Sequence, residues 1–299
     1  MIPRPLSAAL LASLVLSTAP ALAQDAQTSP PAAPAGSVAP PPARAAQAAP
    51  WYRFRAVAEL GFLSVLWHKV QFSRNGTYFD YVKEGGQDNL YSVSRFSVEA
   101  ELFRRHTVVF LYQPLDIETR VLLPNELRVD GATFPAGTPM NLRYGFPFYR
   151  GSYLYDLIED PRHELSIGLG LQIRNATIEF ASQDGALFRS NRDIGPVPLL
   201  KSRGRLGLPR GAFIGYEVDG LYAPISYLNG SDNEVTGAIV DLSLRGGFAL
   251  PLHSEAFLNV RYIGGGATGQ SEPEPPGDGY TKNWLHFLTV SLGASISTF

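Results

Sequence analysis

The sequence predicts an all-β protein whose strands form one antiparallel, up-and-down transmembrane β-barrel of about ten strands, with eight or twelve as alternatives. Three observations predict this fold. Apolar and polar residues alternate with a period of two along many segments, which is typical of strands that separate two environments. The connections between these segments alternate between short and long. After the N-terminal segment no run of 18 apolar residues occurs, so no spanning helix is expected.

The first 23 residues have the features of a secretory signal peptide. Arg4 gives a basic start, residues 8–15 form an apolar run, and residues 21–23 match the A-x-A pattern of a cleavage site. The apolar run is much shorter than the roughly 20 residues that a spanning helix needs. We therefore expect residues 1–23 to be removed and the mature chain to begin near Gln24.

Residues 24–50 are predicted to be a disordered, Ala/Pro-rich linker. Alanine and proline occupy 17 of these 27 positions, a composition that cannot bury a core and favours extended, solvated backbone. The remaining residues, 51–299, are predicted to form the barrel as a single domain.

Ten strands are expected in this domain, each from its own alternating segment. Their predicted ranges are 52–73, 88–103, 106–122, 139–158, 163–181, 194–207, 211–226, 235–250, 254–267 and 281–299. Residues 95–103 illustrate the pattern, because Phe96, Val98, Ala100 and Leu102 alternate with Arg95, Ser97, Glu99 and Glu101. One face of such a strand is apolar and the other is charged.

The connections fall into two classes that alternate along the chain. Tight turns are expected at 104–105, 159–162, 208–210 and 251–253. Long loops are expected at 74–87, 123–138, 182–193, 227–234 and 268–280, and they contain turn-forming pairs such as Asn75-Gly76. All tight turns then lie at one end of the barrel together with both ends of the domain, and all long loops lie at the other end.

A soluble β-sandwich or lipocalin-like barrel is the alternative fold, since it also alternates with a period of two. Two features favour the membrane barrel. Aromatic residues gather near the expected strand ends, at Trp51-Tyr52, 144–155, Tyr222, Tyr227 and Trp284, as in interfacial girdles. The charged residues would also face the interior, whereas a soluble barrel would expose them to water.

Charged residues of both signs are predicted to line the interior. A ten-stranded barrel is narrow, so inward side chains can largely fill it. The predicted inward charges are Arg55, Glu59, Arg95, Glu99, Glu101, Asp116, Glu118, Arg120, Arg150, Lys201, Arg203, Arg205, Glu217, Asp219, Asp241, Arg245 and Arg261.

The turn around Pro209 predicts specific pairs among these charges. If it joins its two strands symmetrically, Arg203 lies opposite Glu217 and Lys201 opposite Asp219. Two interpretations follow. The charges either neutralise one another structurally, since a buried charge is tolerated when it is paired, or they line the path of an ion or small solute, as in a porin.

A catalytic site is a further hypothesis, and it concerns the rim of the barrel. His68 is predicted near the loop end of the first strand and His286 near that end of the last, and these strands are neighbours when the barrel closes. Pairing of Tyr52 with Phe299 would bring His68 opposite about residue 283. Two imidazoles at one rim could serve a hydrolase that acts on lipid or peptide. Aromatic-girdle residues are the alternative interpretation, and no other catalytic chemistry is evident.

Composition excludes several classes of function. The chain contains no cysteine, which rules out disulfides, thiol catalysis and zinc–cysteine sites. A formal net charge of -2 gives no basic field for nucleic acid. No metal site and no cofactor is expected.

Taken together, the leader, the alternating strands, the two classes of connection and the terminal Phe299 resemble bacterial outer-membrane β-barrel proteins; no individual family is matched. In that class a terminal aromatic residue is part of the signal that the barrel-insertion machinery reads. Apolar residues usually occupy every second position before it, whereas here Ile296, Ala294 and Leu292 are shifted by one.

The resemblance implies a location in the outer membrane, with the linker in the periplasm. Outer-membrane lipids, lipopolysaccharide and the insertion machinery are then the expected partners. The leading functional prediction is a barrel with a structural, surface-binding or minor-transport role. The rim hydrolase and the small-solute porin are the alternatives.

Overall fold

The computed structural model describes residues 50–224, 234–273 and 275–299. The predicted signal peptide (1–23) and the predicted linker, apart from Pro50, lie outside these residues. The described part belongs to a compact unit that spans Ala49–Phe299. None of its helices is long and apolar enough to cross a membrane.

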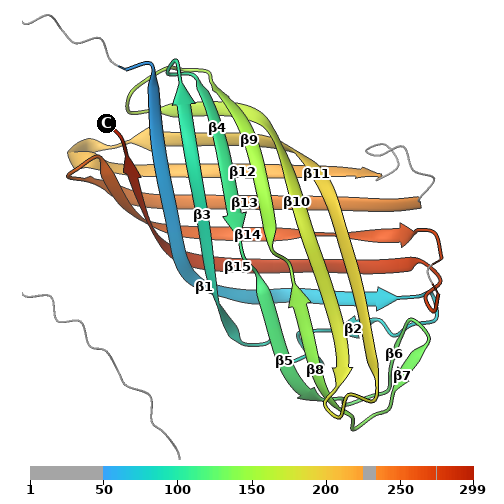
Figure 1. The fold of residues 1–299 in the computed structure, drawn as a ribbon. Coiled ribbons are helices and arrows are strands. Elements are labelled where there is room, and N and C mark those ends of the chain that lie inside the picture. Colours follow the sequence, from blue (N-terminus) through green and yellow to red (C-terminus); the bar gives the residue numbers. More distant parts are fainter. Residues whose placement is uncertain (1–49, 225–233, 274) are drawn as a thin grey trace, which may run out of the picture. The chain divides into compact units, whose positions relative to one another are not determined.

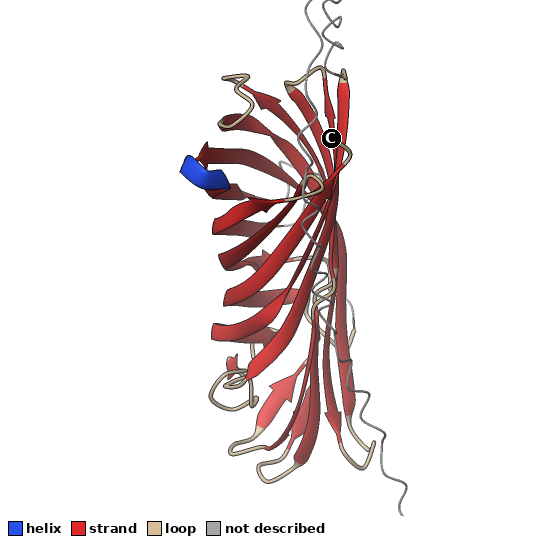
Figure 2. Ribbon diagram, turned by 90° about the vertical axis from the view of Figure 1, so that its left-hand side faces the viewer, coloured by secondary structure: helices blue, strands red, loops and turns tan. Residues whose placement is uncertain are grey.

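The described residues form fifteen β-strands and one short 3-10 helix, η1 (Pro209–Gly211), which is the only helix drawn in Figure 2. The strands, labelled in Figure 1, are β1 (Tyr52–Phe72), β2 (Phe79–Asp80), β3 (Leu90–Leu102), β4 (His106–Gln113), β5 (Asp116–Leu122), β6 (Leu127–Val129), β7 (Ala132–Phe134), β8 (Pro139–Gly145), β9 (Phe148–Asp156), β10 (Glu164–Ser182), β11 (Phe188–Gly207), β12 (Ala212–Pro224), β13 (Glu234–Leu250), β14 (Ser254–Gln270) and β15 (Tyr280–Ser297).

These strands close into an antiparallel barrel. Pairing runs in the order β11-β12-β13-β14-β15-β1-β3-β4-β9-β10, and β10 pairs with β11 to complete the ring. β5 continues β4 and β8 continues β9, so each of these two pairs counts as one strand of the barrel wall. The wall therefore has ten strand positions, which we call staves. The two interruptions face each other, and the Phe146 N–H donates a 2.7 Å hydrogen bond to the Leu115 carbonyl between them. The all-β class and the strand number predicted from the sequence are confirmed.

Most strand bounds agree with the prediction to within two residues, and three larger differences occur. β11 begins at Phe188, six residues before the predicted start at 194. The predicted loop 123–138 contains a hairpin of its own, β6 and β7. β14 ends at Gln270, three residues after the predicted end at 267.

The connections among the described residues have the predicted distribution; the predicted loop 227–234 lies outside these residues, apart from Glu234. We call the end with the short connections after β3, β9, β11 and β13 the turn end, and the opposite end the loop end. Two of the turns place consecutive non-glycine residues at positive φ, Phe103-Arg104 and Leu252-His253. This is the backbone of a type I′ hairpin turn, whose twist matches that of the flanking strands. Trp51 and Phe299 also lie at the turn end, where Phe299 contacts the ring of Tyr52.

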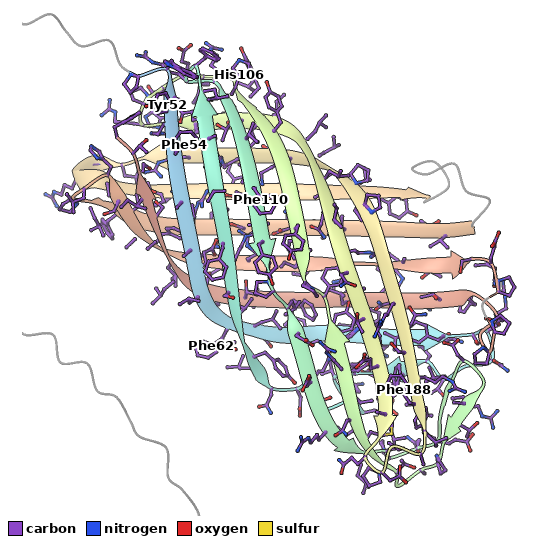
Figure 3. The ribbon with its side chains drawn as sticks, in the orientation of Figure 1. Tyr52, Phe54, Phe62, His106, Phe110 and Phe188 are labelled. Carbon is purple, nitrogen blue, oxygen red and sulfur yellow. The ribbon has the colours of Figure 1, made fainter. Side chains whose placement is uncertain are left out.

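The outside of the barrel carries an apolar belt. Leu60 and Phe62 on β1, and Val108 and Phe110 on β4, are about half or more exposed. Aromatic side chains border this belt at the turn end, where Figure 3 labels Tyr52, Phe54 and His106. The belt is the structural consequence of the period-two pattern, since every second residue of a strand points outward.

The interior has two layers. Charged and polar side chains occupy the turn-end half and the middle, whereas a large apolar cluster fills the loop-end half. The loop between β1 and β3 contributes to this cluster, because Phe79 and Tyr81 are buried against Phe180. The cluster also takes residues from β5, β8 and the β6–β7 hairpin. The loop-end half therefore has the apolar core of a water-soluble β-structure.

Candidate functional site

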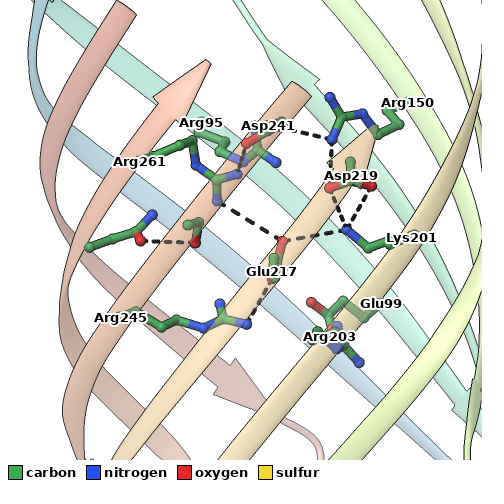
Figure 4. Close-up of polar contacts among 12 residues, drawn as sticks. Arg95, Glu99, Arg150, Lys201, Arg203, Glu217, Asp219, Asp241, Arg245 and Arg261 are labelled. Carbon is green, nitrogen blue, oxygen red and sulfur yellow. Dashed lines mark hydrogen bonds and ion pairs between the residues drawn. The ribbon is translucent and has the colours of Figure 1, made fainter. Parts of the chain in front are cut away.

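The most distinctive site is a network of charged side chains across the middle of the barrel, shown in Figure 4. Nearly every stave contributes to it, because inward positions recur at every second residue of each strand. Fourteen of the seventeen predicted inward charges lie on the interior side of the wall. They are Arg55, Glu59, Arg95, Glu99, Glu101, Arg150, Lys201, Arg203, Arg205, Glu217, Asp219, Asp241, Arg245 and Arg261.

Asp241 on β13 is the centre of the network. Its carboxylate is fully buried and accepts hydrogen bonds from Arg261 at 2.6 Å and from Arg150 at 3.0 Å. Arg95 lies 3.7 Å from the same carboxylate. Three guanidinium groups from β3, β9 and β14 thus converge on one carboxylate, which ties distant staves together through the interior.

A second group lies beside it on β11 and β12. The Lys201 ammonium donates to Asp219 at 3.0 Å and lies 3.5 Å from Glu217. Glu217 also accepts from Arg245 at 2.7 Å, and Asp219 lies 3.0 Å from Arg150. These contacts join the second group to the Asp241 group.

The predicted register of β11 and β12 is confirmed. Lys201 is paired with Asp219 and Arg203 with Glu217. Only the first pair also makes a direct ion pair, because Arg203 instead donates to Glu99 at 3.0 Å and to Glu164 at 2.7 Å. Register fixes which residues are neighbours, but the long Arg side chain selects its partner across the interior.

Two carboxylates of the network were missed in the sequence analysis. Glu164 accepts from Arg203, and Glu255 forms ion pairs with Arg55 at 2.5 Å and Arg205 at 2.6 Å. Both residues lie at the turn-end start of a strand, β10 and β14. Both already lie within the predicted strands 163–181 and 254–267, at positions with the same parity as the inward Ser166 and Arg261, so the period-two pattern itself identifies them.

Buried amides and hydroxyls complete the network. Gln172 accepts two hydrogen bonds from Arg150, and Gln113 accepts one from Arg95 at 2.8 Å. Glu59 accepts from Asn259 at 2.7 Å and Ser291 at 2.8 Å. These neutral partners satisfy donors and acceptors that ion pairs leave over, which makes burial of so many charges tolerable.

The network leaves very little free space. The cavity that it lines has a volume of about 20 Å³, close to that of a single water molecule. Towards the turn end the interior widens into an open hollow of about 500 Å³, lined by Arg53, Glu101, Arg104 and their neighbours. Towards the loop end the apolar core begins with Leu63, Val65 and Leu111. Paired charges and apolar packing together close the middle of the barrel.

Three predicted inward charges lie on the outer face instead. Asp116, Glu118 and Arg120 on β5 point outward, while Ile117 between them is buried. Arg143 on the neighbouring β8 forms a 2.6 Å ion pair with Asp116. The prediction was wrong because it assumed an apolar outer face along the whole strand, whereas here the inner face is apolar.

His68 and His286 do not form a common site. His68 points inward, where it is fully buried, stacks on Tyr81, and makes a 2.8 Å hydrogen bond to Gln87 through Nδ1. His286 points outward and contacts the ring of Trp67. The two imidazoles therefore lie on opposite faces of the barrel wall.

A β-bulge is the physical reason for this separation. The register between β1 and β15 shifts between Val65 and Trp67, which reverses the facing of every residue that follows on β1. His68 is consequently paired with Leu285 rather than with about residue 283 as predicted. The rim pairing of two histidines is thus wrong. In the described part of the chain, no group of three or more His, Cys, Asp or Glu residues could hold a metal ion.

Comparison with known proteins adds resemblances of shape. No known protein family matches the sequence, and no curated protein matches it. The structure is similar to the outer-membrane protease OmpT of Escherichia coli, with a TM-score of 0.48 and 9% identity over 82% of this chain and 96% of OmpT.

It is also similar to the outer-membrane protein AlkL, with a TM-score of 0.33 and 16% identity over 84% of this chain and 93% of AlkL. The toluene transporter TodX of Pseudomonas putida has a TM-score of 0.33 and 8% identity over 83% of this chain and 90% of TodX. These values describe a shared barrel architecture and assign no activity to this chain.

Proposed function

We propose that this protein is a non-conducting barrel of the bacterial outer membrane that carries a rigid, water-exposed head for surface binding. The turn end would face the periplasm and the loop end the exterior. The observation that carries the proposal is a reversal of the apolar pattern part-way along the staves.

β10 displays the reversal within one strand. Its outward side chains are apolar from Leu165 to Ile173 and then become Asn175, Thr177 and Glu179. Its inward side chains change in the opposite sense, from Gln172 to Ala176, Ile178 and Phe180. An outward apolar row suits hydrocarbon, whereas an outward polar row over an apolar core suits water. We infer that β10 leaves the bilayer between Ile173 and Asn175.

The stave formed by β4 and β5, which the stave formed by β9 and β8 separates from β10, supports the same boundary. Its outward residues are Val108, Phe110 and Tyr112 before the interruption, and Asp116 and Glu118 after it. A charged side chain on a lipid-facing surface is destabilising, by about 2–4 kcal/mol for Arg or Lys at the bilayer midplane and by less for Asp or Glu. The segment beyond Tyr112 therefore belongs outside the bilayer.

The closed interior favours a structural or surface-binding role over transport. The central charges are neutralised by partners, and the apolar core lies between them and the loop end. This arrangement argues against the small-solute porin. The rim hydrolase has lost its geometric basis, because its two histidines lie on opposite faces.

Export and insertion complete the proposal. Residues 1–23 would direct export, and residues 24–50 would remain in the periplasm. Phe299, at the end of the closing strand and in contact with Tyr52, would be read by the barrel-insertion machinery. These roles rest on the sequence pattern and on the position of the described C-terminus.

Single cysteines test the topology, since the natural chain contains none. Glu118→Cys should react with a membrane-impermeant maleimide on intact cells. Leu169→Cys, in the outward apolar row, should remain unlabelled, and Asp160→Cys at the turn end should react only after the outer membrane is permeabilised. Equal labelling of all three on intact cells would contradict the proposal.

Conductance tests the closed interior. The purified barrel in planar bilayers should give no resolvable single-channel steps, because the middle of the barrel holds space for about one water molecule. Folding can be verified independently by retarded or accelerated migration on unheated gels. Regular conductance steps from folded protein would refute the non-conducting role.

A further inference from the structure

The outward surface of β1, β14 and β15 carries an aromatic cluster at the loop-end border of the apolar belt. The ring of His286 lies 5.4 Å from Trp67 and 5.9 Å from Tyr262, whose hydroxyl is hydrogen-bonded to His286 Nδ1. On the same surface, Trp284 Nε1 donates to the Thr268 hydroxyl at 2.6 Å. These rings lie directly beyond outward leucines such as Leu66 and Leu288.

Two lysines lie one step further from the belt. Lys69 on β1 is paired with Trp284, and Lys282 on β15 is paired with Gln71, so the lysines are diagonal neighbours on one face. Both ammonium groups approach the ring of Tyr78, at 5.5 Å for Lys69 and 4.4 Å for Lys282. The Tyr78 ring thereby holds two positive charges over the aromatic cluster.

The nearby acids do not neutralise this site fully. Lys69 forms a 3.3 Å ion pair with Asp80, whereas Lys282 has no carboxylate within ion-pair distance among the described residues. Arg74 adds a third cation, with its guanidinium over the ring of Tyr280 at 5.3 Å. The Arg74 backbone N–H donates to Asp278 and lowers the pKa of that carboxyl, so Asp278 stays ionised as the second acid. Of these three cations, only Lys69 forms an ion pair among the described residues.

We propose that Lys69, Lys282 and the ring of Tyr78 bind the phosphate group of an outer-leaflet lipid, whose acyl chains lie along the apolar belt below. The inference rests on the proposed membrane location. It deepens that proposal by naming a lipid partner and the residues that hold it.

The chemistry of the site fits this occupant. Lysine is a strongly hydrated point charge that binds phosphate well, and its stem can cover apolar surface while the ammonium reaches the headgroup level. Tryptophan and tyrosine prefer the same interfacial level. A phosphate with acyl chains attached can contact the cations and the leucine rows at once. A free phosphate ion can contact only the cations.

Binding of a phosphorylated lipid tests the proposal. The full-length protein, folded in neutral detergent, would be titrated with bis-phosphorylated lipid A and followed by native mass spectrometry. The double variant Lys69→Gln/Lys282→Gln should bind at least tenfold more weakly. Lys69→Arg/Lys282→Arg should keep most of the affinity, because it retains both charges.

Lys83→Gln is the matched control, since Lys83 is an exposed lysine of the loop that also carries Tyr78. It should bind lipid A as the unchanged protein does. Dephosphorylated lipid A should bind weakly to every variant, and millimolar inorganic phosphate should not displace lipid A. Equal binding of both lipids, displacement by inorganic phosphate, or full binding by the double glutamine variant would each overturn the proposal.

Failure of the lipid-binding proposal can be distinguished from failure of the proposed membrane location. If the chain is not a membrane barrel, the cysteine-labelling pattern of Glu118→Cys, Leu169→Cys and Asp160→Cys fails. If only the lipid site is wrong, that labelling pattern holds while lipid binding is insensitive to both lysines.

Discussion

Removal of one charge at the centre of the interior should destabilise the whole barrel. Asp241→Asn keeps the shape of the side chain but leaves Arg261, Arg150 and Arg95 without the carboxylate that lies 2.6, 3.0 and 3.7 Å from them. Loss of one partner from a buried ion pair typically costs about 3–5 kcal/mol.

The remaining contacts place the expected loss at the lower end of that range. Arg150 keeps Asp219 at 3.0 Å, and Arg261 keeps the more distant Glu59 and Glu217 at 3.9 and 4.0 Å. We therefore expect Asp241→Asn to lower the free energy of unfolding by about 3 kcal/mol. Urea-induced unfolding in lipid vesicles, followed by tryptophan fluorescence, measures this quantity.

Asp116→Asn is the matched control. The same chemical change removes a 2.6 Å ion pair with Arg143, but both side chains are more than 40% exposed. Exposed pairs contribute about 0–1 kcal/mol, so little change is expected. The double variant Asp241→Asn/Arg95→Gln should be more stable than Asp241→Asn alone, because it removes one cation that has lost its carboxylate. Equal stability of Asp241→Asn and Asp116→Asn would refute the argument.

Two further predictions concern a turn and the loop-end core. Leu252→Asn combined with His253→Gly should raise the free energy of unfolding by about 1–2 kcal/mol. Leu252 and His253 both adopt positive φ, which is unfavourable for a branched or bulky side chain. A lower free energy of unfolding in the same urea experiment would contradict this prediction. Phe180→Ala should lower the free energy of unfolding by about 3–5 kcal/mol, since the Phe180 ring is fully buried against Phe72, Phe79 and Tyr81. A decrease of less than 1 kcal/mol would show that the core is not rigidly packed.

The strands and their order were predictable from the sequence because each signal is local. A period of two, a tight turn and a long loop can be recognised within about twenty residues. The pairing of Lys201 with Asp219 was predictable for the same reason, since a short turn fixes the register of the strands that it joins. Most of the interior charge network follows from that alternation alone.

The partners within the network were less predictable. Arg203 lies opposite Glu217 in the register but binds Glu99 and Glu164 instead. An arginine side chain spans several ångströms and crosses the interior of a narrow barrel, so its partner depends on the curvature of the whole sheet. Local alternation indicates that charges meet in the interior, and the closed barrel decides which ones.

For Asp116 and His68, the period-two pattern alone predicts the wrong face of the barrel wall. A bulge at one residue of β1 reverses the facing of His68 without any glycine or proline at the site that would reveal it. On β5 the facing never changes, and only the surroundings do. Asp116 and Glu118 continue the outward row of Val108 and Phe110.

The pattern on β5 also indicates where the surroundings of a strand change. When the outward row of a strand changes from apolar to charged while its inward row changes from polar to apolar, the backbone has kept its register and the medium has changed. On β10 the change falls between Ile173 and Asn175, and on the stave formed by β4 and β5 it falls between Tyr112 and Asp116. The two staves, separated only by the stave formed by β9 and β8, therefore support one boundary, and the misassigned charges of β5 favour the proposed level at which the barrel leaves the bilayer.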